Sequence, residues 1–265
     1  MTRPFVRTRR QALTEMLGLM GLLSCGALLA GQGGPTLAAR PAGTDGAGSP
    51  RGTHGNGAQV PNRTEGISAL DRNLITAAMG GDLELVNRLL AAGASAQAVD
   101  ERGRSALLTA VYNRRAEVAK TLILAGADVN RKDAESNSPF LLAAATGQVD
   151  VLRLTLSHGA DLASTDRYDG TALIAASQHG NVEVVKLLLQ KGIAVDHVNQ
   201  LGWTALLEAV ILGDGSARYE EIVQLLIDAG ADANLPDREG VSPTRHARDR
   251  GYKSMVKILM RARGH

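Results

Sequence analysis

The sequence has few of the residues on which disulfides, zinc sites and large cores depend. It contains one cysteine, Cys25, so the chain can form no internal disulfide and no zinc site held by several cysteines. Phenylalanine, tryptophan and tyrosine make up 3% of a chain in which 44% of the residues are hydrophobic. Alanine, leucine and valine must therefore do most of the packing, which favours thin, regular helical layers over a large irregular core.

Sequence patterns for catalysis and metal binding are also absent. There is no Gly-x-Ser-x-Gly and no His-Glu-x-x-His, and none of the six histidines pairs with another at metal-ligand spacing. The glycines of GAGSPRG, residues 46–52, follow no predicted strand and open no predicted helix, so they do not indicate a phosphate-binding loop. We therefore predict a protein that is not an enzyme and needs no metal or cofactor.

The N-terminus has the three parts of an export signal. Basic residues open the chain, an apolar run follows at residues 16–30, and small residues end the segment in PTLAA, residues 35–39. The run has 15 residues, which is short of the roughly 20 that a membrane-spanning helix requires. We predict a signal peptide over residues 1–38, with cleavage after Ala38.

Two short motifs concern the export route and the fate of this leader. Arg9 and Arg10 in TRRQALT resemble a twin-arginine signal, although Ala12 stands where an aromatic residue is usual and Thr14 where a lysine is common. That resemblance implies that the protein folds before it crosses the membrane. The alternative is LLSC, residues 22–25, which loosely resembles a lipoprotein box and would place a lipid anchor on Cys25. The predicted location is the periplasm, or a membrane surface if Cys25 is lipidated.

The next segment, residues 39–66, is rich in glycine and proline and has almost nothing to bury, which predicts a flexible linker. Four of the 29 basic residues and one of the 27 acidic residues lie in the leader. Residues 39–265 therefore hold 25 basic and 26 acidic side chains, a balance that argues against nucleic-acid binding along the whole chain.

From residue 67 onward the sequence repeats with a period of 33. The hydrophobic residues that mark the repeat are Leu74, Leu107, Phe140, Leu173 and Leu206. Nineteen residues after the first four of them stand Gly93, Gly126, Gly159 and Gly192. The clearest copy is GTALIAASQHGNVEVVKLLLQKGIAVDHVN, residues 170–199. This period and content resemble the ankyrin repeat.

Each copy predicts two helices and a hairpin-like finger. Ser138 and Pro139 are typical of the start of a first helix, and an apolar run such as VEVVKLLL forms the second. Aspartates at finger positions, such as Asp100 and Asp133, are expected to cap nearby backbone N–H groups. The resemblance implies an all-α ankyrin-repeat solenoid of six stacked helix-turn-helix units over residues 67–265, with degenerate first and last copies as caps.

Repeat five breaks the period. The sixth marker, Thr244, falls 38 residues after Leu206, which indicates a five-residue insertion within ILGDGSARYEE, residues 211–221. One interpretation is a tolerated surface loop, since lengthening a loop costs little free energy. The other is a lip at the edge of a binding face, with Tyr219 as its contact residue. The segment around it looks like a recurring form among small exported bacterial ankyrin proteins.

The resemblance also implies a function, since ankyrin arrays usually bind proteins through the finger tips and the exposed side of the inner helices. Arginine, tyrosine and tryptophan often dominate binding energy, and they recur at these positions. The candidate partner-binding residues are Arg102, Arg104, Tyr112, Asn113, Arg167, Tyr168, His179, Gln200, Trp203, Tyr219 and Arg238. We predict a monomer that binds a protein partner through the concave face of repeats two to five.

Two narrower functions are alternatives to general protein binding. In the first, the protein assists or protects one specific periplasmic enzyme. In the second, it neutralises a toxin. A less favoured function uses the last repeat, since residues 238–265 carry eight basic and two acidic side chains, against 14 and 22 in residues 67–237. Such a basic end suits a membrane surface or nucleic acid, although the solvated face of a capping repeat has the same composition.

Overall fold

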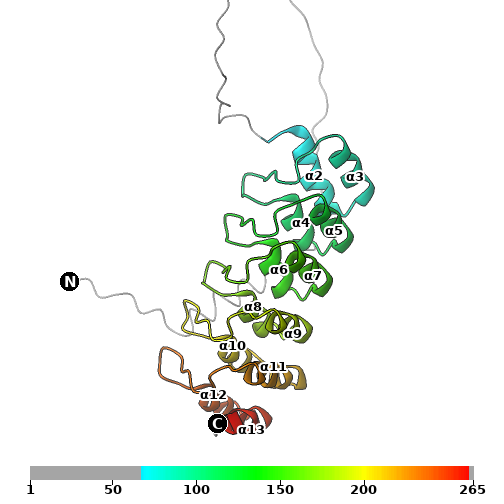
Figure 1. The fold of residues 1–265 in the computed structure, drawn as a ribbon. Coiled ribbons are helices and arrows are strands. Elements are labelled where there is room, and N and C mark those ends of the chain that lie inside the picture. Colours follow the sequence, from blue (N-terminus) through cyan, green and yellow to red (C-terminus); the bar gives the residue numbers. More distant parts are fainter. Residues whose placement is uncertain (1–66, 263–265) are drawn as a thin grey trace, which may run out of the picture. The chain divides into compact units, whose positions relative to one another are not determined.

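The computed structural model describes residues 67–262. The predicted signal peptide, the linker and Cys25 lie outside these described residues. The twelve helices of residues 67–262 form six antiparallel pairs that stack in chain order (Figure 1). The pairs are α2 (Ala69–Gly80) with α3 (Leu83–Ala91), α4 (Ala106–Tyr112) with α5 (Ala116–Leu124), α6 (Pro139–Ala145) with α7 (Val149–Ser157), α8 (Ala172–Gln178) with α9 (Val182–Gln190), α10 (Ala205–Ile211) with α11 (Ala217–Asp228), and α12 (Pro243–Asp249) with α13 (Lys253–Ala262).

The first helix of each pair is the inner helix and packs against the inner helices before and after it. The second, outer helix packs against its own inner helix and against the neighbouring outer helices. The fingers project from the inner-helix side of the stack (Figure 1). Val99 pairs with Ser105 and Thr165 with Thr171 as isolated β-bridges, and no strand is formed within residues 67–262. The predicted all-α solenoid of six helix-turn-helix units is confirmed.

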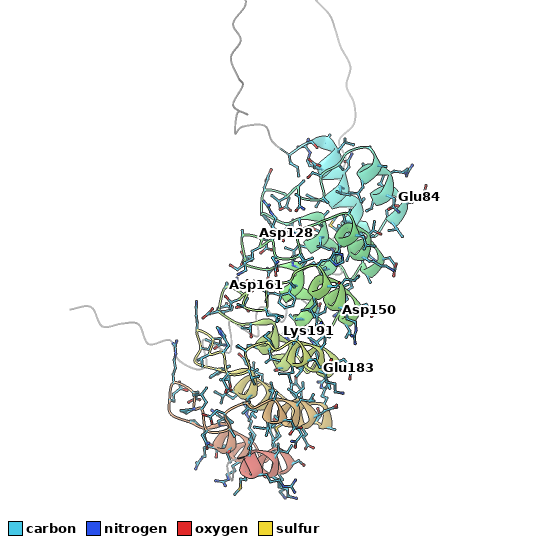
Figure 2. All side chains as sticks on the ribbon, viewed as in Figure 1. Glu84, Asp128, Asp150, Asp161, Glu183 and Lys191 are labelled. Carbon is cyan, nitrogen blue, oxygen red and sulfur yellow. The ribbon has the colours of Figure 1, made fainter. Side chains whose placement is uncertain are left out.

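Local sequence explains where the inner helices begin. A serine or threonine before each of them accepts a hydrogen bond from the backbone N–H three residues later, which satisfies one of the unpaired donors of the first turn. The caps after the first repeat are Ser105, Ser138, Thr171, Thr204 and Ser242. Every outer helix except α13 carries an acid in the first turn, where the helix dipole favours it. Figure 2 shows Glu84, Asp150 and Glu183 on the outer-helix edge of the stack, away from the fingers.

The core is a continuous column of marker residues and small residues. Leu107, Phe140 and Leu173 are fully buried, and so are alanines such as Ala143, which let neighbouring inner helices approach closely. Because one repeat cannot bury its apolar faces alone, stability comes from stacking against neighbours. This dependence makes contacts between repeats as important as those within them.

A row of side-chain hydrogen bonds also joins neighbouring repeats, at the turns between inner and outer helices. In repeats three to five, a side chain near the start of the outer helix donates a hydrogen bond to a carbonyl at the end of the inner helix of the preceding repeat. Gln148 donates to Val111 O at 2.8 Å, and Asn181 donates to Ala144 O at 3.0 Å. The same carbonyls also accept from the turn N–H groups of Arg114 and Gly147, so each side-chain contact adds a second hydrogen bond to a helix-end carbonyl and joins two repeats.

The insertion in repeat five supplies the same contact by another route. The five extra residues place Tyr219 at the position of Asn181, and its hydroxyl donates to Gln178 O at 2.9 Å. Tyr219 is 5% exposed, so the prediction that it is an exposed contact residue of a lip is wrong. The physical reason is that the ring of Tyr219 packs into the core while its hydroxyl reaches the preceding repeat. Tyr252 repeats the arrangement with Gly213 O at 2.9 Å.

Candidate partner-binding surface

Five fingers line one edge of the stack, at residues 99–105, 132–138, 165–171, 198–204 and 236–242 (Figure 1). We number them one to five. Each is folded around a side chain at its base, whose Oδ1 atom accepts hydrogen bonds from the backbone N–H groups two and four residues later. In finger one, Asp100 accepts from Arg102 and Arg104, both at 2.9 Å. The other bases are Asp133, Asp166, Asn199 and Asp237.

These hydrogen bonds stabilise the charged form of the carboxylates. Partial burial raises the pKa of Asp100, but hydrogen bonds from Arg104 and Arg102 outweigh it and hold the pKa below its usual value. For Asp237, burial is likewise outweighed by the hydrogen bonds from Val241 and His246, and the pKa is again lowered. Asp100 and Asp237 are therefore ionised at neutral pH and keep their turns closed.

Contacts between fingers hold them as a row. The backbone N–H of Ala134 donates to Arg102 O at 2.9 Å, which joins fingers one and two. An ion pair between Glu135 and Arg167 joins fingers two and three. The N–H of Gln200 donates to Tyr168 O at 2.8 Å, which joins fingers three and four. Because the row is already ordered, a partner that binds it does not have to order the loops first.

Nine of the eleven predicted binding residues are exposed or half-buried on the fingers and the ends of inner helices. The exposed ones are Arg102, Arg104, Tyr112, Gln200 and Arg238. The half-buried ones are Asn113, Arg167, Tyr168 and His179. We call the surface formed by these nine residues the finger face. Whether it binds a partner stays a prediction.

The large residues of the finger face are held in place. The guanidinium of Arg167 lies over the ring of Tyr168, with 4.9 Å from Cζ to the ring centroid. The side chain of Arg104 bonds to the carboxylate of Asp100, and His179 Nδ1 lies 2.9 Å from Ala175 O. Such fixed arginine and tyrosine side chains lose little conformational freedom on binding.

Trp203 is the second correction to the sequence prediction. It is 4% exposed, so the expectation that its ring is open to a partner is wrong. Its backbone N–H donates to Asn199 Oδ1 at 3.0 Å, at the base of finger four. Leu207 and Ile211 follow it at four-residue intervals and are also buried. Period-four spacing of apolar residues marks a buried stripe of a helix, and here the stripe begins one residue before the cap of α10.

Comparison with known proteins identifies the family. A family model for ankyrin repeats in three copies matches residues 74–166 and 140–237. The chain belongs to the ankyrin-repeat family. An ankyrin repeat domain from Acinetobacter baumannii AYE is 50% identical, with a TM-score of 0.69 over 71% of this chain and 96% of its own. The ankyrin repeat protein EF0377 is 39% identical, with a TM-score of 0.69 over 72% of this chain and 97% of its own.

More distant ankyrin proteins are also similar. The ankyrin repeat domain of Bcl-3, of the IκB protein family, is 30% identical with a TM-score of 0.62, over 72% of this chain and 85% of its own. The putative ankyrin repeat protein YahD of Escherichia coli (strain K12) is 41% identical over 56 residues, which are 21% of this chain. The match spans 28% of the length of YahD. Ankyrin-repeat domains generally mediate protein–protein interactions.

Sequence reasoning missed a buried polar pair behind finger four of the ankyrin array. Glu208, in α10, is fully buried, and its Oε1 accepts a hydrogen bond from Asn199 Nδ2 at 3.0 Å. Burial raises the pKa of Glu208 to about 8, the hydrogen bond from Asn199 opposes the shift, and the charge of Asp166 adds to it. The available signal was Asn199 itself, the one finger base that is not an aspartate. In repeat six the equivalent residues, Asp237 and His246, form a buried pair at 2.8 Å.

Other kinds of site have little support in residues 67–262. No three histidine, cysteine, aspartate or glutamate side chains of this range gather as metal ligands. None of the helices in this range has both the length and the hydropathy needed to cross a bilayer. One shallow depression lies between outer helices α7 and α9, where Arg153, Ser157 and Lys191 line it, on elements separate from the finger face.

Proposed function

We propose that this protein acts after export as a non-catalytic binding module that engages a protein partner through its finger face. The support is the ordered row of fingers, whose tips carry exposed Arg102 and Arg238 and the stacked pair of Arg167 and Tyr168. Adjacent inner helices add Tyr112, which is 51% exposed. Clusters of arginine and tyrosine on a rigid surface are the side chains that most often dominate binding energy.

The test is crosslinked capture from a periplasmic extract with the tagged protein. One variant combines Arg102→Ala, Tyr112→Ala and Tyr168→Ala, which removes three anchors of the finger face. The matched control combines Arg88→Ala, Arg153→Ala and Lys191→Ala, three exposed cations of the outer-helix side. The proposal expects a partner that the parent and the control capture and the finger-face variant loses. Equal capture by all three proteins would contradict the finger face as the site.

The identity of the captured protein decides between two narrower functions. One enzyme or toxin recovered in stoichiometric amount would make this protein its accessory, protective or neutralising factor. Several unrelated partners would instead indicate a general scaffold.

A second candidate function is docking on an anionic surface through the last repeat. Arg245, Arg248, Lys253, Lys257 and Arg261 are all exposed there, and α13 carries no acidic residue. The test is binding to anionic vesicles and to duplex DNA at 50 and 200 mM salt. Electrostatic docking predicts a fall of more than tenfold in affinity over this range. Lack of binding at 50 mM salt would refute it.

A further inference from the structure

The finger bases and the inner helices are matched in pairs. Nine residues after each base, the inner helix of the same repeat presents a residue at an equivalent place. The five pairs are Asp100 with Thr109, Asp133 with Leu142, Asp166 with Ala175, Asn199 with Glu208, and Asp237 with His246. The base is an amide only in the repeat whose helix carries an acid. An aspartate there would place two carboxylates at hydrogen-bond distance in a buried site, where both cannot be ionised.

The contacts of the pair lead from the helix to the finger backbone. The carboxyl of Glu208 accepts from Asn199 Nδ2, which fixes the orientation of the amide. The other end of the amide, Oδ1, accepts from the backbone N–H groups of Leu201 at 2.9 Å and Trp203 at 3.0 Å. Gln200, at the tip of the same finger, is bonded to Tyr168 of finger three. Asn199 therefore links the carboxyl of Glu208 to the backbone of finger four.

We propose that Glu208 is a positioning residue, which acts through Asn199 to hold finger four in its binding conformation only while the carboxyl is protonated. The inference rests on the proposed function of the finger face. Its geometric basis is that Oε2 of Glu208 is buried and has no hydrogen-bond partner among residues 67–262, so the amide of Asn199, on Oε1, compensates a charge on this carboxyl only in part. A buried carboxylate that is only partly compensated must either take a proton or admit water.

Within residues 67–262, the charge that acts on Glu208 comes from an acid and not from a cation. Finger three contributes the carboxylate of Asp166, which repels a charge on Glu208. On α8 the equivalent residue is Ala175, and on α12 it is His246, which is paired with Asp237. The buried residues of α11 include Ile222 and Val223. Ionisation of Glu208 would thus draw water to the base of finger four and loosen the turn, while the other fingers keep their own bases.

The test uses Trp203, which is the single tryptophan of the chain and part of finger four. Its emission and acrylamide quenching are measured on the full chain from pH 6.5 to 9.5, with circular dichroism to follow helix content. We expect a red shift and stronger quenching with a midpoint near pH 8, at unchanged helix content. Glu208→Gln keeps the acceptor for Asn199 without the charge and should abolish the transition. Glu239→Gln, an exposed acid of finger five, is the matched control and should retain it.

Exchanging the pair tests the role of Glu208 without titration, because repeat six has the buried pair of Asp237 and His246 at the equivalent positions. Asn199→Asp alone should already show the red-shifted emission and the stronger quenching of Trp203 at pH 7. Asn199→Asp combined with Glu208→His recreates the pair of Asp237 and His246 and should restore the parent signal. A flat Trp203 profile in the parent, or the same transition in Glu208→Gln, would overturn the proposal. The proposal would also be overturned if Trp203 in the double variant were as red-shifted and as strongly quenched as in Asn199→Asp.

The measurement on Trp203 needs no partner, so the two proposals can fail separately. Once a partner is captured, its affinity for the parent should fall at least fivefold from pH 7 to 9, and that for Glu208→Gln should stay constant. Loss of capture by the finger-face variant without any Trp203 transition would leave the proposed function standing and refute the role of Glu208.

Discussion

The packing of the insertion can be tested with one substitution made at two places. Gly213 and Gly80 both lie outside the left-handed region of φ, so replacing either by alanine removes chain entropy from the unfolded state at no conformational cost in the folded state. Such a change normally stabilises a protein by about 0.4–1 kcal/mol. At Gly80, nothing lies within 4 Å of the added Cβ, and we expect this gain.

At Gly213 the added methyl group has no room. Its Cβ would collide with the carbonyl oxygen of Ala209 and would lie 2.8 Å from Cδ1 of the Tyr219 ring. Overpacking of this kind costs about 1–3 kcal/mol, and a backbone oxygen cannot rotate away as a side chain can. After the entropic gain is subtracted, we expect Gly213→Ala to lower the free energy of unfolding by about 1–2 kcal/mol.

The assay is urea unfolding of the parent and both variants, followed by circular dichroism and by Trp203 emission. If Tyr219 packs against the turn, the two variants should change the free energy of unfolding in opposite directions. Gly80→Ala should be more stable than the parent and Gly213→Ala less stable. A Gly213→Ala protein as stable as the parent would show that the insertion is a loose surface loop and refute the tight turn described above.

Three further predictions concern Tyr219, Glu208 and the N-terminus of the exported protein. Tyr219→Phe removes the hydrogen bond to Gln178 O and should cost about 1 kcal/mol in urea unfolding; no change would mean that the hydroxyl does not tie the repeats together. The raised pKa of Glu208 means that its contribution to stability is complete below pH 4.5 and is lost as pH rises to about 8. The free energy of unfolding should therefore decline over this range, by at most about 1.4 kcal/mol per pH unit, and Glu208→Gln should remove this decline. Mass spectrometry of the exported protein should give an N-terminus after Ala38; a lipid-modified Cys25 would establish the alternative.

The repeat architecture could be predicted from sequence because its signals are local and recur. A serine or threonine cap, a marker such as Leu107 and a glycine 19 residues later each restrict the backbone within a few residues. Their 33-residue spacing then specifies how the units stack. The positions of the exposed finger residues follow from the same alignment, since Arg102 and Gln200 lie at equivalent turns.

What the sequence did not reveal depends on contacts between repeats. Tyr219 and Trp203 align with residues whose exposure differs between copies, from exposed Arg115 and Arg104 to half-buried Asn181 and buried Gly170. The repeat alignment therefore does not specify that both side chains are buried. Glu208 was missed because an acid in a short helix is usually solvated. Its burial becomes apparent only when Asn199 is compared with the aspartates at the other finger bases.

Hydrogen exchange on the protein with its captured partner tests the central claim most directly. If the finger face binds the partner, protection should increase in residues 100–104 and 166–170 and at the ends of α4 and α8, with the outer helices α5, α7 and α9 unchanged. Protection confined to the outer helices or to α12 and α13 would contradict binding through the finger face.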